Sequence, residues 1–70
     1  MPIVIIGAGT HCGVVVDAIR VDGKQKIRGL LDDTLAPGTI RHGIRVLGKV
    51  KNAYFYRKCD IFIAIGDNAG

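Results

Sequence analysis

The 70-residue chain contains no glutamate, so its six acidic residues are all aspartates, and it has only two cysteines. Cys12 and Cys59 lie far apart and belong to no Cys-x-x-Cys pair, which argues against a disulfide framework and against a metal site. The apolar runs at 3–6, 14–16 and 61–65 are much shorter than the ~20 residues that span a bilayer. The N-terminus has no basic leader. We therefore expect a cytoplasmic protein with no metal and no membrane partner.

Size and composition favour one small packed domain rather than a complete large enzyme. Hydrophobic residues make up 49% of the chain, as is typical of globular proteins. Ten Lys and Arg residues against six Asp residues give a formal net charge of +4, which is too diffuse to predict a nucleic-acid partner. The aromatic segment 54–56 beside Arg57 and Lys58 is interpreted as a short helix that covers a sheet, not as a base-stacking surface.

The first half of the chain has a strand–helix–strand pattern. The β-branched run 3–6 predicts a strand buried on both faces. Thr10 is predicted to cap a helix that ends at Asp22-Gly23. A second strand is expected over 27–31, ending in the pair Asp32-Asp33. This helix is expected to have one apolar face, formed by Cys12, Val15, Val16 and Ile19. Asp17 and Arg20 lie on the opposite, polar face.

The second half is richer in loops. Pro37-Gly38 predicts a type II turn, and His42-Gly43 predicts another turn before an extended segment over 44–47. An irregular helix is expected over 49–58, and the run 61–65 predicts the clearest buried strand of the chain. The irregular helix is expected to bury Val50, Ala53 and Tyr54.

This order of elements predicts the α/β class, as a small Rossmann-like three-layer half-domain with a parallel sheet of three to four strands. Parallel strands joined by right-handed crossovers have their C-terminal ends at one edge of the sheet. Three polar loops, over 7–11, 32–33 and 66–68, are therefore expected to meet at that edge.

The meeting of these loops predicts a nucleotide site. Glycines at 7, 9 and 13 let a ligand approach the backbone, and the amides at the helix start favour a phosphate. Asp32 or Asp33 is suited to accept hydrogen bonds from ribose hydroxyls. The spacing G-x-G-x-x-x-G puts Cys12 where a dinucleotide fingerprint has its third glycine, which disfavours NAD. The alternative is a tight turn that needs glycine for its geometry alone.

Two residues at the predicted helix start have competing interpretations. His11 is suited to donate to a phosphate or sugar oxygen, with a solvated turn residue as the alternative. Cys12 is interpreted as a small packing residue and not as a nucleophile, because the sequence places no base beside it. No residue is predicted to be catalytic.

Five blocks that cover nearly the whole chain resemble a known family when they are taken together. They are IVIIGAGTH at 3–11, VVVDAI at 14–19, GLLDD at 29–33, VLG at 46–48 and FIAIGDN at 62–68. In this order they resemble the N-terminal domain of the bacterial sugar O- and N-acetyltransferases, of the sialic acid O-acetyltransferase and nucleotide-amino-sugar N-acetyltransferase type.

The resemblance implies that residues 1–70 form a Rossmann-like domain that binds a nucleotide-linked sugar of the UDP-sugar type. It assigns the phosphate and sugar to the first loop, the nucleoside to the aspartate pair and further sugar contacts to the last loop; the residues are Gly7, Gly9, Thr10, His11, Asp32, Asp33, Gly66, Asp67 and Asn68. It also implies a C-terminal left-handed β-helix of hexapeptide repeats, absent from these residues, that holds the catalytic histidine and acetyl-CoA and makes full-length relatives homotrimeric.

We therefore expect an acceptor-binding domain that binds no cofactor itself and has no acetyltransferase activity alone. A fragment of an NAD-binding oxidoreductase and a non-catalytic nucleotide-sensing module remain the alternatives. Weak self-association is also expected, because the chain stops before any helix that would cover its last strand and such sheets normally have helices on both faces.

Overall fold

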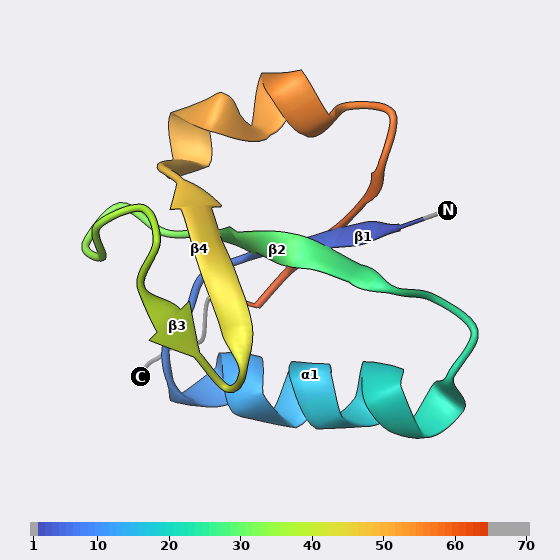
Figure 1. Ribbon diagram of the computed structural model, residues 1–70. Coiled ribbons are helices and arrows are strands. Elements are labelled where there is room, and N and C mark those ends of the chain that lie inside the picture. Colours follow the sequence, from blue (N-terminus) through green and yellow to red (C-terminus); the bar gives the residue numbers. More distant parts are fainter. Residues whose placement is uncertain (1, 65–70) are drawn as a thin grey trace.

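The computed structural model describes residues 2–64 and has three layers, with a sheet between two helices (Figure 1). The sheet has five strands in the order β3-β4-β2-β1-β5. Strands β4, β2, β1 and β5 are parallel, whereas β3 is antiparallel to β4. The strands are β1 Ile3–Ile6, β2 Ile27–Leu31, β3 Ile40–Arg41, β4 Ile44–Gly48 and β5 Asp60–Ile63. The predicted α/β half-domain with a parallel sheet is confirmed, with one antiparallel strand added.

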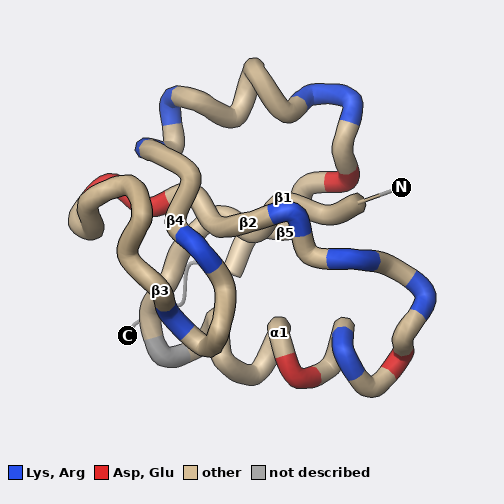
Figure 2. Tube along the Cα trace, in the orientation of Figure 1, with Lys and Arg blue, Asp and Glu red and all other residues tan. Residues whose placement is uncertain are grey.

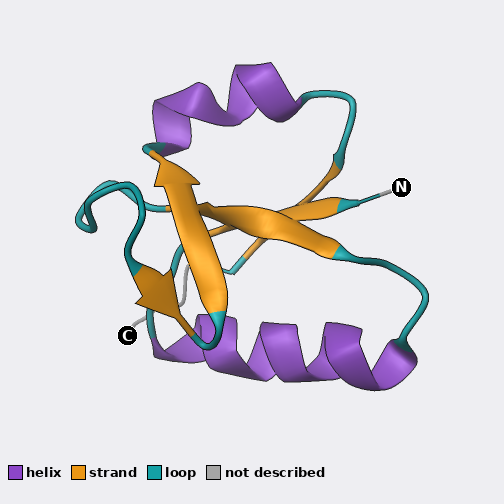
Figure 3. Ribbon diagram, in the orientation of Figure 1, coloured by secondary structure: helices purple, strands orange, loops and turns teal. Residues whose placement is uncertain are grey.

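The helix α1, Thr10–Asp22, covers one face of the sheet (Figure 3). Its predicted apolar face is confirmed, because it packs on the strands within one core cluster whose buried members include Ile5, Cys12, Val15, Val16, Leu30 and Val46. Gly23 ends the helix in the left-handed region, with φ 70°, and donates its N–H to the Ile19 carbonyl at 3.0 Å. The prediction that Thr10 caps the helix is wrong, since Gly9 is the N-cap residue and Thr10 already lies inside α1.

The opposite face is covered by a short 3-10 helix, η1, Val50–Tyr56. Its core consists of Val4, Ile6 and Leu31, against which Val50, Ala53 and Tyr56 pack as half-buried side chains. The prediction that Tyr54 is buried is wrong. A 3-10 helix repeats every three residues, so the side chains at 50, 53 and 56 share one side, whereas the prediction assumed α-helical spacing.

The strand β3 was not predicted. It is only two residues long and both are exposed, so it leaves no pattern of buried residues in the sequence. His42 and Gly43, with φ 54° and 76°, form the tight turn between β3 and β4, which confirms a turn there. The Pro37-Gly38 turn is also confirmed, because the Thr39 N–H donates to the Ala36 carbonyl at 3.1 Å.

The strand β5 is the edge strand of the sheet beside β1. The prediction that it is buried is wrong: Ile61, Phe62 and Ile63 are 40%, 44% and 65% exposed. An apolar run gives the same signal for a central and an edge strand, so the sequence pattern did not distinguish them. The end predicted for this strand, at residue 65, lies outside the described residues.

Candidate functional site

The loop between β1 and α1 carries the first set of predicted site residues. Gly7 has φ 98°, which only glycine adopts readily, and its N–H donates to the Leu31 carbonyl at 2.8 Å. The next residue, Ala8, is buried. Gly9 is exposed, and a Cβ built on it would meet nothing within 4 Å. The backbone at Gly9 is therefore open to a ligand.

Asp32 joins this loop to the end of β2. Its Oδ2 accepts a hydrogen bond from the Ala8 N–H at 2.9 Å. Its Oδ1 accepts from the Thr34 N–H at 2.8 Å, the Thr34 hydroxyl at 2.6 Å and the Leu35 N–H at 3.2 Å. Burial acts to raise the pKa of the Asp32 carboxyl, but these hydrogen bonds outweigh it and the pKa lies below its ordinary value. Both oxygens of this carboxylate thus hold the protein's own backbone in place.

Asp33 is exposed, and its carboxylate bonds to the start of the other helix, η1. Its Oδ1 accepts a hydrogen bond from the Val50 N–H at 2.9 Å, at the first residue of η1. The Lys49 Nζ donates to the Asp33 carbonyl at 3.3 Å. Asn52 completes this helix start by accepting from the Lys49 N–H at 3.0 Å. The two neighbouring aspartates therefore organise different segments, although the sequence presented them as equivalent.

The first two predicted loops meet at the C-terminal edge of the parallel strands, as the bond between Ala8 and Asp32 shows. The third loop, with the predicted contacts Gly66, Asp67 and Asn68, lies outside the described residues. Ala64, the residue after β5, is described, and its N–H donates to the Ile6 carbonyl at 2.8 Å. The last strand thus ends beside the start of the glycine loop.

The hairpin turn between β3 and β4 packs on α1, which the sequence analysis missed. A Cβ built on Gly13 would lie 3.0 Å from the Cε1 and 3.1 Å from the Nδ1 of His42. A Cβ on Gly43 would lie 3.1 Å from the Arg20 Nη2. Gly13 therefore leaves room for a histidine ring and not only for a ligand, as its place in the glycine loop had suggested. No sequence pattern relates Gly13 to His42 or Arg20 to Gly43, because β3, the first strand of this hairpin, leaves no signal in the sequence.

The two residues with competing interpretations differ in exposure. Cys12 is completely buried in the core under α1. Burial and, to a lesser degree, the negative charge of Asp32 raise the pKa of its thiol, so the interpretation as a packing residue is confirmed. His11 lies exposed in the first turn of α1, one residue beyond Thr10. It is therefore accessible to a ligand at the helix start.

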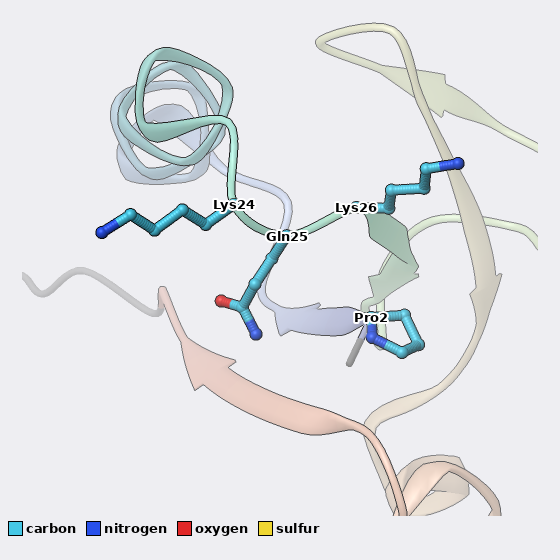
Figure 4. A pocket seen from close by; sticks show the side chains of 4 residues that line it. All are labelled: Pro2, Lys24, Gln25 and Lys26. Carbon is cyan, nitrogen blue, oxygen red and sulfur yellow. The ribbon is translucent and has the colours of Figure 1, made fainter.

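A pocket of about 370 Å³ lies near the N-terminal ends of β1 and β2, away from the glycine loop (Figure 4). It is lined by Pro2, Lys24, Gln25 and Lys26. The side chains of Lys24 and Lys26 point in opposite directions (Figure 4). The Gln25 amide donates to the Asp60 carboxylate of β5. The two lysines thus do not converge on an anion. Among residues 2–64, no group of acidic, histidine or cysteine side chains is arranged for a metal, and no helix is long and apolar enough to cross a membrane.

The fold and the glycine turn define a small Rossmann-like half-domain. The family model of the PglD N-terminal domain matches residues 2–70. The chain belongs to this family, the N-terminal domains of PglD-type sugar acetyltransferases, which confirms the resemblance. The comparison with curated proteins found no match.

Proposed function

We propose that this domain binds the acceptor of an acetyl-CoA-dependent sugar acetyltransferase, a nucleotide-linked sugar of the UDP-sugar type. The observation that carries the proposal is the hydrogen bond from Ala8 to Asp32, which fixes an open glycine turn at the C-terminal edge of four parallel strands. Ligands of open α/β sheets bind at this edge. Family membership supports the sugar acetyltransferase context.

In this proposal the phosphates lie against the backbone of Gly7 and Gly9 and the start of α1, within reach of Thr10 and His11. The free N–H groups and dipole at the start of a helix favour an anion there. Gly66, Asp67 and Asn68 contact the sugar, as the family resemblance implies. The domain contributes by orientation, because a held amine or hydroxyl meets an acetyl group far more often than a free one.

The two aspartates take different parts in the proposed site. Asp32 already accepts four hydrogen bonds from the protein, so its part is to hold the glycine loop in its open shape. Asp33 is exposed and is the better acceptor for the nucleoside. This division gives the predicted pair one positioning residue and one ligand-contacting residue.

The chemistry of acetyl transfer is proposed to lie outside residues 1–70. A general base must lie within hydrogen-bond reach of the acceptor proton, and the family resemblance assigns that histidine and the acetyl-CoA site to a trimeric β-helix of hexapeptide repeats. The 70-residue chain alone is then inactive, and the whole transferase is a cytoplasmic bacterial enzyme. Acetyl transfer by the isolated chain at the rate of a full-length relative would contradict this.

Calorimetric titration of the chain with a UDP-sugar, NAD and ATP in parallel tests the ligand class. The proposal expects binding of the UDP-sugar in preference to the other two. Preference for NAD would instead favour an oxidoreductase fragment, and preference for ATP a nucleotide-sensing module. Either result would overturn the proposal.

The variant Gly9→Ala tests where the ligand lies. Gly9 has φ −80° and open space at its Cβ position, so alanine fits the free protein without strain. A ligand that touches this backbone meets the added methyl group, and we expect UDP-sugar affinity to fall about tenfold or more, as one ill-fitting contact does. The matched control is Val21→Ala, at an α1 side chain that is 88% exposed, which should change neither affinity nor melting temperature. Unchanged binding by Gly9→Ala would place the ligand elsewhere.

A further inference from the structure

The net charge of the protein is concentrated on one short segment. The residues from 49 to 58 include four basic side chains and no acidic one; these are Lys49, Lys51, Arg57 and Lys58. The other six basic residues of the chain equal its six aspartates in number. One aspartate, Asp33, bonds to the first residue of η1, so the segment together with Asp33 has a formal charge of 4 − 1 = +3. Figure 2 shows the basic residues at both ends of η1, on the layer opposite α1. The charge that had appeared diffuse in the sequence is thus local.

The 3-10 geometry turns two aromatic side chains of this segment outward. Because residues three apart eclipse in such a helix, Lys51 and Tyr54 lie in one outer row and Phe55 lies in the next. Arg57 and Lys58 directly follow the helix, and the Arg57 guanidinium lies against the Tyr54 ring. Tyr54 is 67% exposed and Phe55 is 74% exposed, whereas the third row packs on the sheet. The outer surface of η1 therefore combines large apolar groups with cations.

The geometry of the two rings disfavours a nucleic acid on this surface. The ring centroids of Tyr54 and Phe55 lie 6.4 Å apart, and the ring planes make an angle of 71°. The Arg57 guanidinium lies 4.2 Å from the centroid of the Tyr54 ring, over one face of it. Successive bases stack on open, roughly parallel aromatic faces, which this pair does not offer.

We propose that the outer surface of η1 binds the surface of an anionic phospholipid membrane. Aromatic rings with a polar tip or edge lie stably at the boundary between headgroups and acyl chains, and Lys and Arg bind the lipid phosphates beside them. Such a contact tolerates many geometries, which suits a short helix with flexible cations. No helix within residues 2–64 can span a bilayer, but contact with a membrane surface needs none.

Sedimentation with vesicles tests the proposal. The wild-type chain is mixed with vesicles of phosphatidylcholine alone and of phosphatidylcholine and phosphatidylglycerol in equal parts, at low and at physiological salt. We expect binding only to the anionic vesicles and weaker binding at the higher salt. The double variant Tyr54→Ser/Phe55→Ser should bind about tenfold more weakly or worse, because it loses the apolar contact. Both side chains are exposed, so the circular dichroism spectrum of the double variant should match that of the wild type.

A pair of charge variants separates a local site from general attraction. Lys51→Gln/Arg57→Gln/Lys58→Gln removes three charges from η1 and the two residues that follow it, and at about fivefold for each charge it should weaken binding by on the order of 100-fold. Lys24→Gln/Lys26→Gln/Arg41→Gln removes three exposed charges elsewhere and should weaken it by less than about fivefold. Equal losses in the two variants, no binding by the wild type, or tighter binding to oligothymidine than to anionic vesicles would each overturn the proposal.

Discussion

The two faces of the sheet are built differently, although one set of strands supplies both. The 13-residue α1 buries Cys12, Val15 and Val16 against three strands. The seven-residue η1 buries no residue completely and leaves two aromatic rings exposed. The α1 face therefore provides most of the hydrophobic core. The η1 face provides less stability and more surface, which suits a contact with something outside the domain.

The aspartate pair repeats this difference at the scale of two residues. Asp32 bonds to the loop that leads into α1, and Asp33 bonds to the first residue of η1. Neighbouring residues at the end of one strand point to opposite sides, so each carboxylate reaches one layer. The pair thus fastens both layers to the end of β2.

The largest expected effect compares two buried leucines on the two faces. Leu30 lies in the α1 core and Leu31 in the η1 core, and both are completely buried. Leu30→Ala should lower the free energy of unfolding by about 3–5 kcal/mol, because α1 cannot close the cavity. Leu31→Ala should cost only about 2–3 kcal/mol, because the short η1 can settle into the gap. Urea denaturation measures both, and equal losses would contradict the difference between the faces.

The next effect separates the two aspartates. Asp32→Asn should cost about 1–3 kcal/mol, because its bonds to Ala8, Thr34 and Leu35 cannot all be kept by an amide. Asp33→Asn should stay within about 0.5 kcal/mol of the wild type, because the amide oxygen can still accept from Val50.

The decrease of the unfolding free energy at acid pH should also depend on Asp32. The pKa of Asp32 is lowered in the folded state, so its contribution is complete above the unfolded value of about 3.9 and is lost as the pH falls through the lower, folded-state pKa. Unfolding free energies measured from neutral to strongly acid pH should fall less steeply in Asp32→Asn than in the wild type. An unchanged acid slope would mean that other carboxylates dominate.

A smaller effect concerns the hairpin that packs on α1. Gly13→Ala gains about 1 kcal/mol of helix propensity, but its Cβ crowds the His42 ring. We expect the single variant to stay within about 0.5 kcal/mol of the wild type. In a His42→Gly background, where the ring is gone, the same change should stabilise the protein by about 1 kcal/mol. The same effect in both backgrounds would show that the ring does not lie on Gly13 in solution.

The smallest effect on stability concerns β5, whose side chains remain exposed on both faces. An exposed apolar edge strand is a site for pairing between chains, so sedimentation equilibrium should detect weak self-association of the wild type. Ile63→Lys should abolish it and change stability by less than about 0.5 kcal/mol. Val21→Lys, which places a lysine at an exposed apolar position on α1, should leave the self-association unchanged. A strictly monomeric wild type at high concentration would refute the expectation.

The sequence predicted well where a pattern depends on neighbours along the chain. The burial of Val16 follows from helical spacing, the end of α1 from Gly23, and the meeting of the first two loops from parallel strands. It failed where the outcome depends on distant segments. Nothing in the run 61–65 tells whether a further strand lies beside it. The failure at Tyr54 has a local cause instead, because η1 has three residues per turn and the prediction assumed α-helical spacing.

The sequence identified candidate site residues, but it did not predict the different roles of Asp32 and Asp33. The sequence left open which of the two aspartates faces a ligand, and their hydrogen bonds distinguish one that shapes a loop from one that bonds to the start of a helix. That distinction depends on which amides lie within 3 Å or so of each oxygen, and such distances are set only when the strands pair.

The bond between the Ala8 amide and Asp32 joins residues that are 24 positions apart. The amide has this partner only after β2 has docked beside β1, so the turn cannot acquire its final shape ahead of the sheet. Formation of the sheet and the final shape of the glycine turn are therefore one cooperative event, and before β2 has docked the turn lacks the hydrogen bond that holds it in the folded domain.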